Sequence, residues 1–210
     1  EEGRYARVEY RQEHRAIADS LLGIADDVLP PVARLCGYPL AALERDKATI
    51  LLTSIPDVSN GYAVGDAVVI YALSSAYIPS WTGITPWYPQ VLAHELVHHV
   101  TFRKLRRKAN LAGNIVYLSV PRWFWEGTAQ YFSESWNAYR GDIYLKYAVL
   151  NGKLGLDDLY SQEDGRLLYA AAHAFTRYLA GQYGDSALVK LMSHNENGWF
   201  FSFHRAFQSV

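Results

Sequence analysis

Short apolar segments in the first half of the chain predict three strands and one helix. The strand candidates alternate in polarity or are rich in β-branched residues, and they are 6–11, 47–54 and 65–75. Between the first two, apolar residues recur at helical spacing from 13 to 28, which predicts a helix that ends near Pro30-Pro31. The stretch NGYAVG (60–65) predicts a turn before the last strand.

After Pro89 the pattern changes to the longer period of amphipathic helices. A proline-rich loop is expected at 76–89, and helices are expected at 90–108, 122–136, 140–150, 166–182 and from about 198 to the end. The fold class is therefore α+β, with an N-terminal lobe (about 1–89) that holds a small mixed sheet and a helix, and a mainly helical lobe (about 90–210). We expect one catalytic domain over 1–210, with the helix at 90–108 where the lobes join.

Composition limits the classes of function. Half of the 210 residues are hydrophobic, which is enough for one core or for two lobes that share a cleft. The formal net charge of -1 gives the whole molecule no electrostatic reason to bind nucleic acid. No window approaches about 18 uninterrupted apolar residues, so no transmembrane segment is expected. The single cysteine, Cys36, excludes an internal disulfide, and we expect it to be a core residue.

Both ends of the sequence look cut. The chain starts EEGRYARV, without an initiator Met, and ends FHRAFQSV within an amphipathic pattern. We therefore expect a fragment of a longer chain. Either a removed signal peptide or trimming of the chain would explain the start, and no targeting segment remains to decide between them. The first explanation favours an extracytoplasmic location, whether secreted, periplasmic or envelope-associated. The sequence does not determine the oligomeric state.

The segment VLAHELVHHVTF (91–102) places three of the seven histidines on an apolar helix. Positions i and i+4 share one face, so His94 and His98 can direct two imidazoles at one point. A catalytic Zn²⁺ takes three protein ligands, often imidazoles, and leaves one position open. Glu95 is turned by about 100° from His94, beside such a metal, where a base can accept a proton from water. The alternative is two hydrogen-bonded histidines and a surface glutamate on a core helix.

A third ligand is needed, and its position decides the class of site. The form H-E-x-x-H-x-x-G-x-x-H is excluded, because Thr101 and Lys104 stand where it needs Gly and His. Downstream, Glu126 lies at the start of the helix predicted at 122–136, within PRWFWEGTAQYFSE. A carboxylate from a second helix would complete a His₂Glu zinc site with His94 and His98.

HELVH followed by P-x-W-F-x-E-G-x-A-x-Y resembles the gluzincin metallopeptidases, in particular the bacterial peptidase MA-like group. The match covers about 90–135, and a weaker one covers 168–192. The resemblance implies a zincin-like fold with the zinc ion in the cleft between two lobes. It also implies that His94, His98 and Glu126 are the zinc ligands and that Glu95 is the general base.

One position departs from the pattern of that group. Members often carry Glu one turn after the third ligand, whereas this chain has Gln130. An amide orients a ligand imidazole less strongly than a carboxylate does, so the surroundings of the ligands differ here.

The developing oxyanion of peptide hydrolysis benefits from a second donor besides the metal. Tyr169 and His173 are one turn apart on the helix predicted at 166–182, at the border of its apolar stripe. We take these two as the candidates for that role. A Tyr/His pair that only packs at a helix border is the alternative.

The resulting hypothesis is zinc-dependent hydrolysis of a peptide or protein substrate. One alternative is a zinc-binding, peptidase-like domain with little turnover that serves binding or assembly; the intact Glu95 argues against it. Another is nucleic-acid binding by FRKLRRK (102–108), which holds five cations. Cations at a helix C-terminus complement the helix dipole and normally remain solvated, so we expect no nucleic-acid partner.

Overall fold

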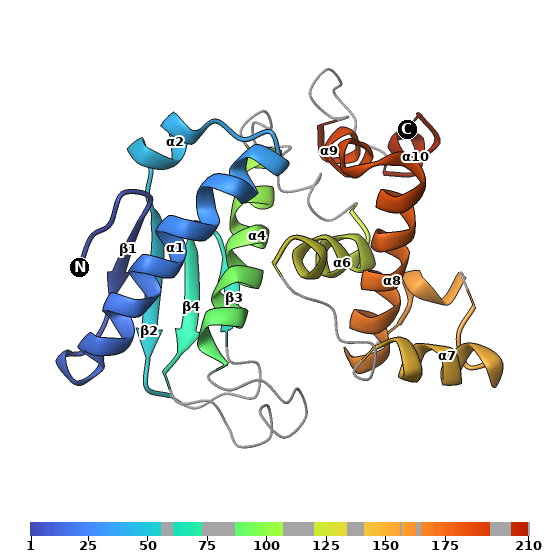
Figure 1. The fold of residues 1–210 in the computed structure, drawn as a ribbon, viewed down its shortest axis with the longest axis horizontal. Helices are drawn as coiled ribbons and strands as arrows, with labels where there is room; N and C mark the ends of the chain where they lie inside the picture. Colours follow the sequence, from blue (N-terminus) through green and yellow to red (C-terminus); the bar gives the residue numbers. More distant parts are fainter. Residues whose placement is uncertain are drawn as a thin grey trace. The chain divides into compact units, whose positions relative to one another are not determined.

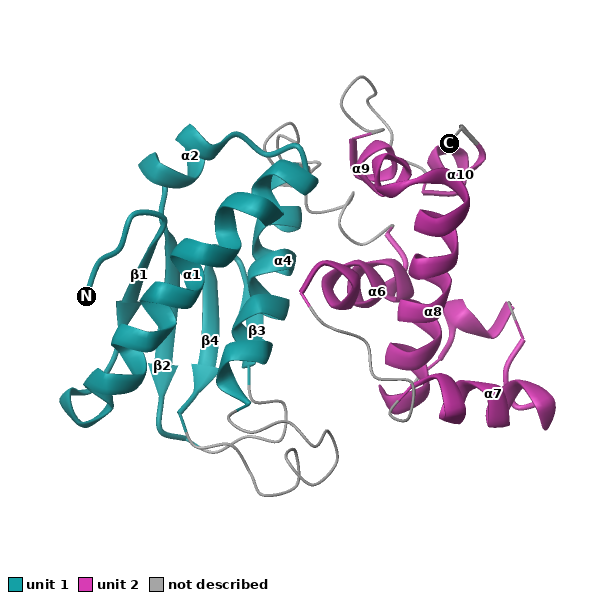
Figure 2. Cartoon of the chain, in the orientation of Figure 1, with its two compact units in different colours: residues 1–104 teal, residues 105–210 magenta. Residues whose placement is uncertain are grey.

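A computed structural model describes residues 1–55, 61–72, 87–106, 120–133, 141–155, 157–162, 165–193 and 203–209. By their internal contacts, the residues form two compact units, Glu1–Lys104 and Leu105–Val210 (Figure 2). The boundary lies near the end of the histidine helix, so this helix belongs with the sheet and not with the second unit. A single catalytic domain made of both units stays a prediction.

The first unit contains a four-stranded mixed sheet with the order β1-β2-β4-β3 (Figure 1). Its strands are β1 (Ala6–Glu9), β2 (Ala48–Thr53), β3 (Gly61–Val64) and β4 (Ala67–Tyr71). The pairs β1–β2 and β2–β4 are parallel, whereas β3 and β4 are antiparallel. The small mixed sheet and the three strands that the sequence predicts are confirmed.

The strand register places one apolar row on the core face of the sheet. Val8 pairs with Ile50, and Ile50 pairs with Val68 on the next strand. All three side chains are buried. On the other face of the sheet, Nε of Arg7 donates to Oγ1 of Thr49 at 3.0 Å. The alternation of the sequence thus separates the two faces of the sheet.

Helix α1 (Arg15–Leu35) connects β1 to β2, and the predicted end near Pro30 is wrong. Proline removes one backbone donor and normally breaks a helix interior. Here Pro31 and Asp27, the residue four positions before it, are exposed, so water can reach the carbonyl that lost its partner. The buried face continues beyond the prolines through Val32 and Ala33, and this packing keeps the helix intact.

The segment 60–65 is not simply a turn, because it contains strand β3. Only Gly65, with φ +58°, and Asp66 form the turn to β4. β4 lies between β2 and β3, so β3 is the edge strand on that side.

Helix α4 (Tyr88–Arg106) carries the histidines and lies with α1 over the sheet (Figure 1). It begins where the Trp87 carbonyl accepts from the backbone N–H groups of Gln90 and Val91 at 3.1 Å. Val91 contacts the sheet closely, since a Cβ built on Gly61 would lie 3.2 Å from Val91 Cγ2. The first unit also contains η1 (Gln12–His14) and α2 (Leu40–Arg45).

Cys36 follows α1 and is buried, as predicted. Burial raises the pKa of its thiol to about 12, although a hydrogen bond with Thr101 and the charge of Lys104 oppose that shift. The contact with Thr101 joins the end of α1 to α4.

The second unit is helical in its described residues, as predicted. Its helices are α6 (Arg122–Ser133), α7 (Asp142–Leu150), η2 (Asp157–Tyr160), α8 (Gly165–Tyr183), α9 (Asp185–Ser193) and α10 (Phe203–Ser209). Of these, η2 and α9 were not predicted. No helix in the described ranges is long and apolar enough to cross a membrane.

Helices α6 and α8 form the centre of this unit (Figure 1). Trp123 of α6 contacts Phe175 of α8 and Phe203 of α10, with ring centroids 4.8 and 5.7 Å apart. Gly127 allows the closest approach, since a Cβ there would lie 2.5 Å from the Ala172 carbonyl oxygen and even nearer to Thr176 Oγ1. A glycine is therefore required where the two helices cross.

We predict that Gly127→Ala lowers the stability of the protein by about 1–3 kcal/mol, because the added methyl group meets backbone atoms of α8 that cannot move easily. Gly23→Ala is the matched control, since nothing lies within 4 Å of its Cβ position in α1, and it should be neutral or stabilising. Urea unfolding of both variants measures the difference. Equal stabilities would show that α6 and α8 do not cross this closely.

Candidate metal centre

His94 and His98 direct their ring nitrogens at each other on one face of α4. Their Nε2 atoms are 3.1 Å apart, and the ring centroids are 4.8 Å apart at an interplanar angle of 81°. Both side chains are buried. At this distance two neutral imidazoles can share one hydrogen bond, or both lone pairs can bind one cation. In a tetrahedral zinc site with Zn–N bonds of about 2.0–2.1 Å, two ligand nitrogens lie about 3.3 Å apart, which the pair nearly matches.

Phe102 supports this arrangement one turn further along the helix. Its ring stacks on that of His98, with centroids 5.5 Å apart and an interplanar angle of 14°. The stacking limits rotation of the imidazole and so helps to keep Nε2 directed at His94. Sequence reasoning missed this residue, although the i, i+4 spacing from His98 to Phe102 was available as a signal.

Glu95 is an acidic residue with unusually low solvent exposure. Its side chain is only 8% exposed, and within the described ranges the structure gives it neither a hydrogen bond nor an ion pair. An ionisable side chain with so little exposure is unfavourable unless its carboxylate reaches water, a hydrogen-bond partner or a metal ion. The position beside the two imidazoles therefore suggests a function for Glu95 that packing does not explain.

Glu126 lies in the first turns of α6 in the second unit. The helix begins at Pro121, whose carbonyl accepts from the backbone N–H of Phe124 at 3.0 Å. Buried Trp123 and Phe124 fix the helix within its unit and leave Glu126 partly exposed. Arg122, one turn earlier, lies 3.9 Å from Oε1 of Glu126, and this cation was also missed by sequence reasoning.

His94, His98 and Glu126 form the group of potential metal ligands among the described residues. One ligand atom from each lies within 4.8 Å of the others. Two imidazoles and one carboxylate are a donor set that suits Zn²⁺ and leaves a fourth position open. The structure thus brings together the three residues that the sequence predicts as ligands, and the identity of the metal remains a proposal.

The two candidates for the oxyanion donor both lie on α8. His173 is buried in α8, with its ring centroid 6.3 Å from that of Tyr131 on α6. Tyr169, one turn earlier on α8, is partly exposed. Both roles in catalysis stay predictions.

Gln130, at the position where the gluzincins often carry Glu, is buried. Its Oε1 atom receives no hydrogen bond from any part of the chain that the structure describes. In the described residues this oxygen therefore does not accept from an imidazole N–H, as an orienting carboxylate would. His99, next to the ligand pair, is also fully buried.

At the basic end of α4, one of the five cations differs from the expected solvated surface. Arg103 is buried, and Lys104 donates to the Gly37 carbonyl at 3.4 Å. Because Arg103 contacts the sheet side of the first unit, it is not available as part of a nucleic-acid surface. The segment 107–108 lies outside the described residues.

Comparisons with known proteins gave no match among family models, curated proteins or solved structures. The resemblance to the gluzincins therefore depends on the residues of the two helices, and the activity that it implies is a proposal.

We predict that the purified protein binds one equivalent of Zn²⁺. His98→Ala and Glu126→Gln should each lower zinc affinity by more than the roughly 10–100-fold that follows loss of an outer partner of a ligand. His204→Ala is the control, because His204 is exposed on α10 and its ring hydrogen-bonds with Gln208 of the same helix. Competition with a chelating dye measures the affinities. Less than roughly half an equivalent after zinc supplementation would contradict the site.

Proposed function

We propose that the protein is a zinc-dependent peptidase of gluzincin type, with a zincin-like fold. The observation that carries this proposal is Glu95, which is only 8% exposed, has no hydrogen bond or ion pair among the described residues, and directly follows the first of two converging imidazoles. A histidine pair with a purely structural role does not need a carboxylate beside it. Metal-assisted hydrolysis does need a general base beside the metal, and this base must be free to accept a proton.

His94, His98 and Glu126 would hold the metal. A zinc ion bound there would supply Lewis acidity, which makes a water molecule more acidic and polarises a carbonyl group. The burial of the histidines excludes competing solvent from their side of the site. Phe102 keeps the His98 ring in a fixed orientation.

Glu95 moves the proton in the proposed reaction. Its carboxylate accepts a proton from the water molecule that attacks the peptide carbonyl carbon, and it then donates this proton to the leaving amine nitrogen. The carboxylate is therefore unprotonated again at the end of the reaction. Low exposure strengthens its interaction with the reacting groups, since little water competes.

Strand β3 is the element that could hold an extended substrate. It is an edge strand and pairs antiparallel with β4 through its inner side. Gly61 at its start lies against Val91, one turn before His94 on α4. Among the described strands its outer side has no neighbour, so a peptide can add to the sheet there by backbone hydrogen bonds.

A second candidate is a zinc-binding, peptidase-like domain with little turnover. The buried and unbonded amide oxygen of Gln130 favours it, because a carboxylate in that place would support a ligand better. An extracytoplasmic location and a protein or peptide partner stay predictions for both candidates.

We predict that Glu95→Gln keeps the fold and the zinc ion but lowers peptidase activity by about 10²–10⁴-fold, the usual size of a general-base contribution. The amide has the same shape and cannot accept the proton. Hydrolysis of labelled casein, with zinc content measured in parallel, tests this. Glu9→Gln is the control, because Glu9 is an exposed residue of β1. Unchanged cleavage by the Glu95 variant would assign the base elsewhere, and a parent protein that binds zinc without cleaving would favour the second candidate.

We predict that Tyr169→Phe lowers kcat more than it raises KM. A phenol stays protonated at neutral pH and can donate to the developing oxyanion without adding charge, and a contact made mainly in the transition state affects kcat. Tyr178→Phe is the matched control on α8, because Tyr178 is exposed and about half a turn around the helix from Tyr169. If Tyr169→Phe equals the control while a His173 variant loses kcat, the donor is His173.

A further inference from the structure

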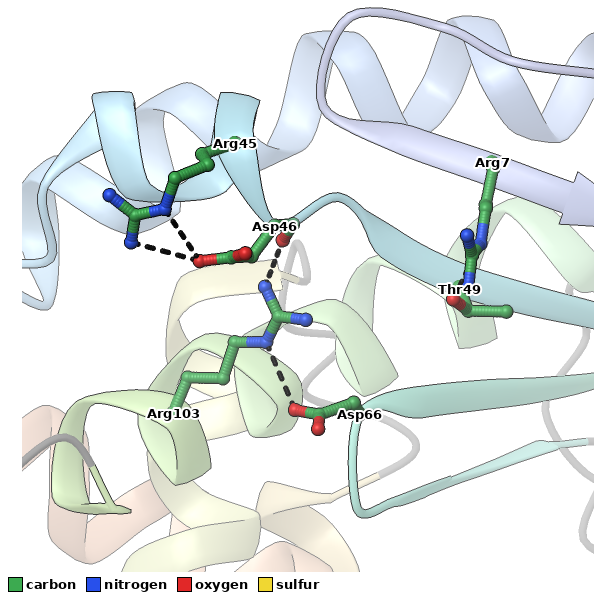
Figure 3. A network of polar contacts seen from close by, with 6 residues as sticks. All are labelled: Arg7, Arg45, Asp46, Thr49, Asp66 and Arg103. Carbon is green, nitrogen blue, oxygen red and sulfur yellow. Dashed lines mark hydrogen bonds and ion pairs between the residues drawn. The ribbon is translucent and has the colours of Figure 1, made fainter.

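Arg103 is buried near the C-terminal end of α4, although most helix-terminal arginines are solvated. Only 9% of it is exposed. Its Nη1 donates to the backbone carbonyl of Asp46, and its Nε donates to Oδ1 of Asp66 at 3.3 Å (Figure 3). One guanidinium therefore connects the ligand helix to two separate loops of the first unit.

The contact with Asp46 fixes the guanidinium in place. Asp46 stands between α2 and β2, and its carboxylate is already bound by Arg45, with Nη2 to Oδ2 at 2.9 Å (Figure 3). Arg103 uses the backbone carbonyl, which the adjoining strand β2 holds. The planar guanidinium can then present its Nε–H in one direction only, toward Asp66.

Asp66 lies in the turn between β3 and β4, after Gly65 in the left-handed conformation. Its side chain is 74% exposed. A pair with one partner so exposed contributes little to stability, because water screens it. The contact joins the turn after β3 to α4.

A second contact fixes the other end of the strand. Gly61, where β3 begins, lies against Val91 near the start of α4. Asp66, in the turn that follows β3, is bound by Arg103 near the end of α4. Val91 and Arg103 lie on either side of His94, Glu95 and His98 along α4, so the two contacts place β3 beside this part of the helix.

We propose that the Arg103–Asp66 pair is a positioning device, which fixes the register of edge strand β3 against the ligand helix. This proposal rests on the proposed peptidase function. An extended peptide that pairs with β3 has its scissile bond placed by that register, and a slip of one residue displaces the bond by about 3.3 Å. The pair thus acts on substrate binding through β3, and it touches neither the metal ligands nor Glu95.

The test compares Asp66→Asn with the parent protein, with Asp66→Glu as the conservative variant. Asp19→Asn, on the exposed face of α1, is the matched control. Labelled casein is the substrate for kcat and KM. Its affinity is also measured by fluorescence anisotropy on zinc-loaded protein that carries Glu95→Gln, in which cleavage is removed. Hydrogen exchange follows the amides of 61–64.

We expect Asp66→Asn to raise KM and Kd about 3–10-fold with kcat within about twofold, since uniform binding is lost. Zinc content should stay unchanged, exchange should become faster in β3 and not in β2, and Asp66→Glu should restore most of the affinity. Equal KM and Kd in Asp66→Asn and the parent would overturn the positioning role. A loss of zinc and kcat together would show a general structural role instead.

The two proposals fail in different ways. If zinc-loaded parent protein does not cleave casein but Asp66→Asn still weakens its binding, the peptidase function is wrong and the positioning pair stands. If casein is cleaved and Asp66→Asn behaves as the parent does, the function stands and the positioning pair is wrong.

Discussion

The packing of helix α4 on the sheet of the first unit is the contact on which the site depends. Residues 91–100 are all buried, and apolar side chains such as Leu92 and Leu96 account for the stability of that arrangement. The same stretch carries Glu95 and three histidines. Ionisable groups in such surroundings are unfavourable unless they find partners or a metal ion. This conflict between apolar packing and buried charge is the main physical reason to assign a function to the helix.

The three proposed ligands differ in how they are held. Both histidines are fixed by one helix, and the stacked ring of Phe102 restricts one of them further. Glu126 is held by a different set of contacts, those of α6 with the aromatic centre of the second unit. A metal that joins them would add its binding free energy to the stability of the native state, because the unfolded chain has no preformed site.

The sheet side of α4 serves the proposed function in another way. Gly61 and the turn at Asp66 tie both ends of β3 to the ligand helix, once by close apolar contact and once by a charged hydrogen bond. The apolar contact contributes to stability. The exposed charged contact contributes little to stability, and its proposed role is to position the turn after β3. An edge strand that is held in this manner can serve as a fixed template for an extended chain.

The sequence by itself determined the features that depend on local geometry alone. The long helices at α4, α6 and α8 follow from apolar periodicity, and the convergence of His94 and His98 follows from 3.6 residues per turn. Only the tertiary structure decided the rest. The continuation of α1 through Pro30, the edge position of β3 and the burial of Arg103 depend on which surfaces meet, and no periodicity encodes this. Glu126 lies on a separate element, so helical spacing, which explains why His94 and His98 converge, does not fix its distance from the imidazoles.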